Sequence, residues 1–66
     1  MDRKANGAKM RKLRGTRTAA EVAEAIGVSV GSILMYEQGY RVPRDDVKEA
    51  IAEYYGVTVG WLFFDR

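Results

Sequence analysis

The stretch Thr18-Ala-Ala-Glu-Val-Ala-Glu-Ala-Ile-Gly-Val-Ser29 contains the signals that decide the fold of this chain. Thr18 and Glu21 form a capping box, in which each side chain can bond the backbone amide of the other, and this pattern predicts the beginning of a helix. Gly27 is suited to the left-handed conformation that ends a helix. The residues between these signals put three apolar side chains on one helical face: Val22, Ala23 and Ile26.

Only Val28 and Ser29 remain to connect this helix to the next one. Ser29 is a favoured N-cap, and Gly39 provides a second glycine stop. The helical spacing predicts that Val30, Ile33 and Tyr36 point inward. A glycine-containing turn this short packs two helices at a steep angle, so the residue at their closest approach must be small. Ala23 meets this requirement. The pattern therefore predicts a helix-turn-helix that ends at Gly39.

Boundary signals of the same kind predict three more short helices, which gives an all-α chain of five helices. The first would run from a cap at Asn6 to about Arg14, the fourth from a cap at Asp45 or Asp46 to Gly56, and the fifth from a cap at Thr58 to about Phe64. No segment alternates polar and apolar residues over the length of a strand. We predict one domain over residues 1–66, with its core at about 6–64 and residues 1–5 disordered.

The composition excludes several classes of protein. The 66 residues include no cysteine and no histidine, which removes the thiolate and imidazole metal ligands and the usual general base. Asp45, Asp46 and Glu49 cluster, but a helix cap beside a solvated face explains them better than a metal site. No apolar run approaches the roughly 18 residues of a membrane span. We expect a cytoplasmic protein with no catalytic residue, cofactor, metal, membrane contact or small-molecule substrate.

The charges are unevenly distributed along the chain. Residues 1–17 contain seven basic residues and one acidic residue, a net charge of +6, whereas residues 18–66 contain four basic and eight acidic residues, a net charge of −4. A positive end on a chain of net charge +2 is consistent with contact to a polyanion such as nucleic acid. A solvated basic helix explains the same charges, and the charge pattern alone slightly favours this simpler interpretation.

The predicted helix-turn-helix, followed by Ile33, Tyr36-Glu37-Gln38-Gly39 and Pro43, resembles the Cro/repressor family, also called XRE or lambda-repressor-like. The tail from Tyr55 to Phe63 is similar to the way these domains end. Leu13-Arg14-Gly15 and Pro43-Arg44-Asp45 resemble short regulators of phages and mobile elements. The resemblance covers about residues 8–64. It implies a compact five-helix DNA-binding domain that acts as a Cro-like, repressor-type transcriptional regulator.

The resemblance also implies roles for individual residues. About Ser29–Gln38 would be the recognition helix in the major groove of double-stranded DNA. Its base-facing residues would be Ser29, Val30, Gly31, Ser32 and Met35. Contacts to phosphate or the minor groove would come from Arg14, Arg17, Thr18, Gln38, Arg41 and Arg44. Lys12 and Glu37 would form a structural ion pair, and a homodimer would be joined through Trp61, Phe63 and Phe64. Because the sequence ends at Arg66, we expect no effector domain.

The sequence departs from the family pattern in two places. Ala19 stands where the family often has a glutamine that contacts phosphate. The base-facing set also lacks the arginine, asparagine and glutamine that read base edges with paired hydrogen bonds. Gly31, costly in a helix, reflects either drift or close approach to DNA. The chain either binds DNA through thymine methyl contacts and DNA shape, or is a protein-interaction module of antitoxin or anti-repressor type with weak DNA binding.

Overall fold

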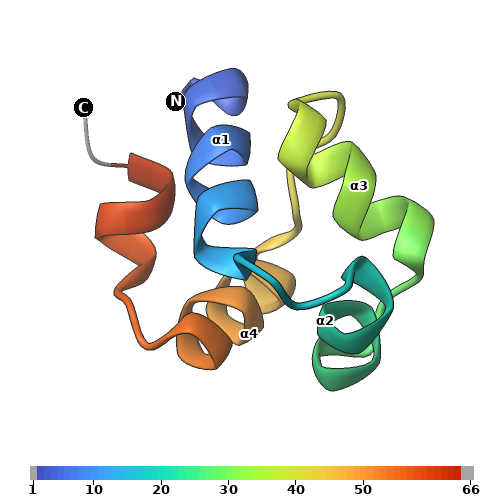
Figure 1. Cartoon of the computed structure of the whole chain (residues 1–66). Helices are drawn as coiled ribbons and strands as arrows, with labels where there is room; N and C mark the ends of the chain where they lie inside the picture. Colours follow the sequence, from blue (N-terminus) through green and yellow to red (C-terminus); the bar gives the residue numbers. More distant parts are fainter. Residues whose placement is uncertain (1, 65–66) are drawn as a thin grey trace.

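The computed structural model describes residues 2–64 and contains the predicted helix-turn-helix as α2 (Ala19–Ile26) and α3 (Val30–Gln38), shown in Figure 1. The Thr18 hydroxyl accepts a hydrogen bond from the Glu21 amide at 3.1 Å, and the Ser29 hydroxyl accepts one from the Ser32 amide at 3.1 Å. Both caps therefore lie where the sequence predicts them. The two helix axes meet at 108°.

Gly27 makes the sharp turn between these helices possible. Its φ of 87° lies in the left-handed region, where a residue with a side chain would be strained. The amides of Gly27 and Val28 both donate to the carbonyl of Ala23, at 2.8 and 3.0 Å. Ala23 is buried, and Ile33 from α3 is buried in the same core. The small residue, the glycine and the apolar filling of the angle are all confirmed.

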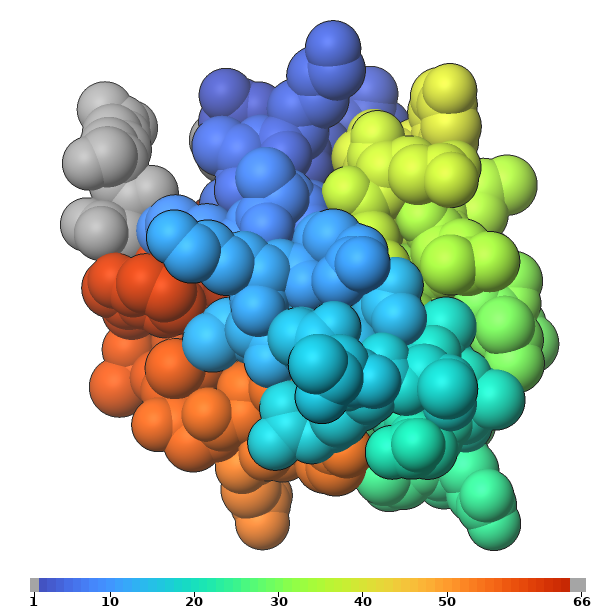
Figure 2. All heavy atoms as spheres, in the orientation of Figure 1, coloured from blue at the N-terminus to red at the C-terminus, as the bar shows by residue number. Residues whose placement is uncertain are grey.

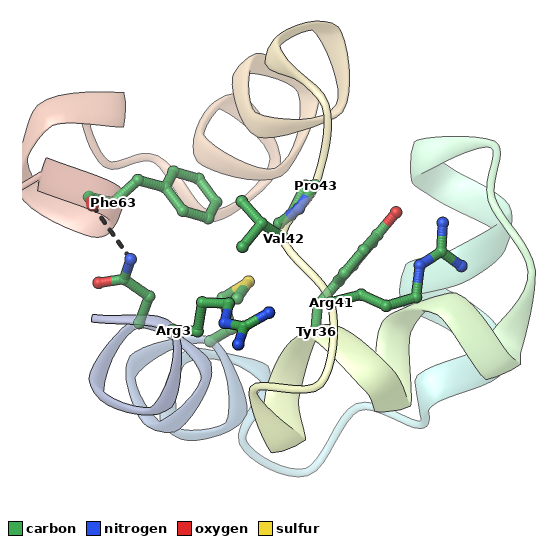
Figure 3. A pocket seen from close by; sticks show the side chains of 8 residues that line it. Arg3, Tyr36, Arg41, Val42, Pro43 and Phe63 are labelled. Carbon is green, nitrogen blue, oxygen red and sulfur yellow. Dashed lines mark hydrogen bonds between the residues drawn. The ribbon is translucent and has the colours of Figure 1, made fainter. Parts of the chain in front are cut away.

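The first helix, α1 (Arg3–Arg14), begins earlier than the sequence analysis predicted. The Asp2 carboxylate caps it by accepting hydrogen bonds from the Lys4 and Ala5 amides, at 3.0 and 3.1 Å. Asn6, the predicted cap, is instead buried, and its Nδ2 donates to the carbonyl of Phe63 at 3.0 Å (Figure 3). Aspartate and asparagine are equally good caps, so only the distant contact to Phe63 decides between them.

Helix α1 crosses α3 at very close range. A Cβ atom on Gly7 would lie 2.6 Å from the carbonyl oxygen of Tyr36, so only glycine fits at this crossing. A Cβ on Gly39, just after α3, would lie 3.1 Å from the Cα of Lys4. Gly39 also has a φ of 79°. The C-terminal half of α3 is therefore fixed against α1, while α2 contacts the other half.

The remaining elements, α4 (Asp45–Tyr55) and η1 (Gly60–Phe64), close the core from below and from the side of α1 in Figure 1. Residue Arg44 occupies the N-cap of α4 without a side-chain bond, so the predicted cap at Asp45 or Asp46 is wrong. Both aspartates lie in the first turn, where their charge favours the positive helix end. Element η1 is one turn of π-helix, and the Thr58 hydroxyl accepts from the Trp61 amide. The core comprises Met10, Val22, Ala23, Ile33, Tyr36, Val47, Ile51, Leu62 and Phe63.

No single helix within residues 2–64 is long and apolar enough to cross a membrane. The pair α2 and α3 passes a test of length and composition only when its two helices are taken together across their 108° bend.

Candidate nucleic-acid interface

The outward face of α3 is the candidate interface. Many of its side chains are apolar but exposed, and exposed apolar patches mark interaction sites. Val30, Leu34 and Met35 are exposed, and Ile33 and Tyr36 on the opposite face are buried. Four of the five predicted base-facing residues, namely Ser29, Val30, Gly31 and Met35, are exposed, and Ser32 is half-buried. Helical geometry thus separates α3 into a packing face and a free face. The inward positions predicted for Ile33 and Tyr36 are confirmed, but the one predicted for Val30 is wrong, because Val30 lies on the exposed side with Leu34.

Leu34 belongs to this free face but was absent from the sequence-based set. It is exposed beside Val30 and Met35. Residues four apart on a helix lie above one another, so the spacing of Val30 and Leu34 already contained the signal. The free face of α3 is therefore defined by Val30, Gly31, Leu34 and Met35, with Ser29 and Ser32 at its N-terminal edge.

Two hydroxyl groups provide the polar part of this edge. The Ser29 hydroxyl accepts from the Ser32 amide and donates to the Ser32 hydroxyl at 2.9 Å. The Ser32 hydroxyl consequently keeps its own proton for an outside acceptor. Gly31, between them, has no structural reason to lack a side chain, since a Cβ there would meet only the Ser29 Oγ, at 3.9 Å.

Glu37 pairs with Arg14 rather than with Lys12, so the predicted ion pair is wrong. The Arg14 Nε and Nη2 donate to the two carboxylate oxygens of Glu37, at 2.8 and 3.0 Å. The exposed fractions of these side chains are only 12% for Arg14 and 5% for Glu37. The hydrogen bond to Glu37 raises the pKa of Arg14 above its usual value. Arg14 follows Gly7 and Met10 on the face of α1 that meets α3, whereas Lys12 points to solvent.

Arg14 and Arg17, both predicted to contact the DNA backbone, already have partners inside the protein. A further nitrogen of Arg14 donates to the carbonyl of Arg17 at 2.9 Å. The Arg17 guanidinium donates to the carbonyl of Leu13 and lies 5.5 and 5.9 Å from the ring centres of Tyr54 and Tyr55. Burial and the nearby Glu37 charge raise the pKa of Tyr55. Both arginines therefore tie the connection between α1 and α2 to the rest of the fold.

The other predicted backbone contacts are exposed on either side of α3. Thr18 lies at the beginning of α2, and Gln38, Arg41 and Arg44 lie at and beyond the end of α3. The Arg41 guanidinium is 5.8 Å from the ring centre of Tyr36, and Arg44 forms only an exposed ion pair with Asp46 at 3.7 Å. An exposed pair of this kind contributes little to stability, so Arg44 is free to exchange it for another anion.

A helix-turn-helix family model matches residues 8–62, which is most of the chain and includes both helices of the motif. The chain belongs to the Cro/repressor-type helix-turn-helix family. The chain is also 39% identical, over 59 residues, to the cryptic phage CTXphi transcriptional repressor RstR of Vibrio cholerae. That match covers 86% of this chain and 53% of the repressor, so the chain spans about half the length of this relative. No solved structure matches this chain.

The helix-turn-helix is followed by a C-terminal aromatic run of which only part is available to a partner. Phe63 is 1% exposed and packs in the core, so it cannot belong to the predicted dimer surface. Trp61 and Phe64, at 44% and 56% exposed, remain on the outside of η1. Lys9 donates to the carbonyl of Trp61 at 2.7 Å and lies 4.6 Å from its ring centre. The sequence predicts that this run is only partly buried, but the choice of Phe63 depends on tertiary packing.

Proposed function

We propose that this chain is a sequence-specific DNA-binding transcriptional regulator of Cro-like, repressor type, with α3 as its recognition helix in the major groove. The observation that carries this proposal is the free face of α3, which the turn at Gly27 holds at 108° to α2. A second helix exposed in this way can enter a major groove while the first helix crosses the DNA backbone. The family assignment supports the same function.

The chemistry of the free face favours recognition of thymine methyl groups. Val30, Leu34 and Met35 offer apolar contact, and thymine is the base that presents a methyl group in the major groove. Ser29 and Ser32 add hydroxyl groups that can bond to base edges or phosphate. Gly31 lets the helix backbone approach the bases closely, which explains a glycine that the fold itself does not require.

Backbone contacts would come from Thr18 at the beginning of α2, from Gln38 at the end of α3, and from Arg41 and Arg44 in the loop that follows. All four residues are exposed. Arg14 and Arg17 contribute indirectly, since their internal bonds fix α1 against α2 and α3. Phosphate contacts carry no sequence information. The four exposed residues would therefore fix the position of the protein on the duplex, and the free face of α3 would determine which base sequence is preferred.

A homodimer through Trp61 and Phe64 would complete the regulator. Both aromatic side chains are exposed on η1, and buried aromatic residues commonly dominate protein interfaces. A two-fold dimer of helix-turn-helix domains puts its recognition helices about 34 Å apart, one turn of DNA. The bound sequence is then expected to be an inverted repeat.

Selection of bound duplexes from a random pool tests this function. We expect one enriched inverted repeat, and log affinity falling linearly with log salt. Arg41→Ala and Arg44→Ala should each weaken binding to all duplexes and reduce the salt slope by about 1 for each bound subunit, or about 2 for the dimer. Lys12→Ala, which removes an exposed charge from α1, is the matched control. A chain that binds no duplex at low salt would contradict the proposal.

A second function is favoured by the apolar character of the same face. Val30, Leu34 and Met35 on one exposed strip also suit a protein-interaction module of antitoxin or anti-repressor type. Selection from the random pool of duplexes separates the two functions, since a protein-interaction module would enrich no duplex. Met35→Lys adds a second criterion, because a new cation on α3 would strengthen non-specific DNA binding but disrupt an apolar protein interface.

A further inference from the structure

The first turn of α1 lies against the C-terminal end of α3 and carries two cations there. We propose that Arg3 and Lys4 form a second phosphate-binding surface, which contacts DNA backbone flanking the major-groove site. The proposal rests on the proposed function, because the ligand is the same duplex. It extends the interface to a helix outside the helix-turn-helix, whose own backbone contacts would come from Thr18, Gln38, Arg41 and Arg44.

The position of these cations is fixed by a backbone contact that only glycine allows. A Cβ on Gly39 would lie 3.1 Å from the Cα of Lys4 and 3.2 Å from the carbonyl oxygen of Arg3. The first turn of α1 is therefore held directly against the residue that ends α3. Figure 2 shows this turn and the chain just after α3 side by side on one face of the molecule.

The first turn of α1 and the chain at the end of α3 border an open depression of about 460 Å³. Its lining comprises Asp2, Arg3, Lys4, Gln38, Gly39 and Tyr40. On its other side Arg3 also lines a small pocket shared with Arg41, which follows α3 (Figure 3). Arg3 therefore connects the depression to the loop that carries the proposed backbone contacts Arg41 and Arg44.

Arg3 and Lys4 line this depression and Arg41 lines the adjoining small pocket, and none of the three has a carboxylate partner in an ion pair within residues 2–64. The carboxylate that lines the depression, Asp2, caps α1 by accepting the amides of Lys4 and Ala5, and it keeps its negative charge there. Arg3, Lys4 and Arg41 outnumber this carboxylate, and the net positive charge favours a polyanion.

The shape of the depression favours a nucleic-acid strand over a small anion. The depression is open, and the side chains of Arg3, Lys4 and Tyr40 around it are exposed. A small anion is retained by buried, converging donors, whereas exposed cations along a surface match the regular charge spacing of a DNA backbone. The surface also continues from the end of the recognition helix, where duplex that leaves the major-groove site would pass.

The test compares two double variants that remove the same charge from the same helix. Arg3→Gln with Lys4→Gln removes the proposed contacts, and Arg11→Gln with Lys12→Gln removes two exposed cations from the other end of α1. All four side chains are exposed and glutamine is a good helix former. The hydrogen bond that the control variant loses, from Arg11 to the carbonyl of Gly15, is long at 3.4 Å and exposed, so both variants should unfold much like the parent. Affinity is measured against salt for the selected duplex, once with long mixed-sequence flanks and once trimmed to the selected repeat.

On the long duplex, the Arg3→Gln, Lys4→Gln variant should reduce the salt slope by between about 1 and 2 for each bound subunit, and the control variant should reduce it clearly less. On the trimmed duplex, the difference between this variant and the parent should shrink. Equal slopes for the two double variants would overturn the inference and leave the proposed function intact. A parent that binds neither duplex would instead overturn the proposed function, and the inference with it.

Discussion

At the scale of single residues, the pair Arg14–Glu37 shows how burial raises the importance of an ion pair. Arg14 donates two hydrogen bonds to the Glu37 carboxylate and a third to the carbonyl of Arg17. Exposed ion pairs contribute little, but a buried charge that loses its partner leaves hydrogen-bonding groups unsatisfied. The pair therefore joins α1 to α3 and fixes the beginning of α2 at the same time.

Glu37→Gln should lower the free energy of unfolding by about 2 kcal/mol, because Arg14 would keep its charge but lose an ionised acceptor. Lys12→Gln should change it by no more than about 0.5 kcal/mol, since Lys12 is exposed. Urea unfolding of both variants measures the difference. If Lys12→Gln were as damaging as Glu37→Gln, the pairing of Glu37 with Arg14 would be wrong.

At Gly31, stability of the fold favours alanine, whereas the proposed DNA contact favours glycine. Its Cβ would meet only one side-chain atom, so Gly31→Ala should stabilise the fold by about 1 kcal/mol through helix propensity. The same methyl group would stand between α3 and the bases, so duplex affinity should fall. Thermal unfolding and duplex titration of one variant check both effects. Unchanged or tighter duplex binding would indicate that Gly31 arose by sequence drift and has no role in DNA contact.

At the scale of elements, the fold depends on how closely α1 and α3 approach. Gly7 lies over the carbonyl oxygens of Tyr36 and Glu37, and the Arg14–Glu37 pair closes the other end of the crossing. The free face of α3 is thereby held by the whole length of α1 as well as by the turn to α2. If α3 is the recognition helix, as proposed, its support on two sides means that it loses little entropy on binding, which favours affinity.

Gly7→Ala should destabilise the chain by about 2 kcal/mol, because a Cβ would press against backbone atoms that cannot move aside. Gly31→Ala is the matched control: the same substitution in a helix, but facing open space, with the opposite expected sign. Denaturant midpoints of the two variants give the comparison. Stabilisation by both substitutions would show that helix propensity outweighs the close crossing.

At the scale of the whole molecule, the two functional surfaces lie on different elements. The free face belongs to α3, and the exposed aromatic side chains Trp61 and Phe64 belong to η1, which packs on α1 (Figure 1). Helix α1 therefore stands between the proposed DNA surface and the proposed dimer surface. A dimer through η1 would leave α3 of each copy free for its half-site.

Trp61→Ser with Phe64→Ser should weaken self-association by at least about 10-fold in dissociation constant, because exposed aromatic side chains that become buried provide much of an interface's energy. Phe63→Leu, a change in the core, should lower stability but leave the dissociation constant unchanged. Sedimentation over a range of concentrations measures both. A Trp61, Phe64 variant that still dimerises like the parent would move the interface elsewhere.

Features that depend on residues close in sequence were predictable. The caps at Thr18 and Ser29 and the turn at Gly27 all use hydrogen bonds within a few residues. The helix-turn-helix could therefore be predicted from its own stretch of sequence. The free face of α3 followed from helical periodicity, and the same rule applied one step further would have included Leu34.

Features that depend on distant residues were decided only by the tertiary structure. Asn6 is bonded to Phe63 across 57 positions, and Arg14 to Glu37 across 23, so local pattern could not name either partner. For the same reason Phe63 seemed available as a dimer contact until packing buried it. The sequence by itself determined which helices form and which way α3 faces, because hydrogen bonding and side-chain direction are local. Tertiary packing decided whether Lys12 or Arg14 pairs with Glu37, which aromatic side chain is buried and where the first turn of α1 lies, because each is a choice among groups that local sequence does not separate.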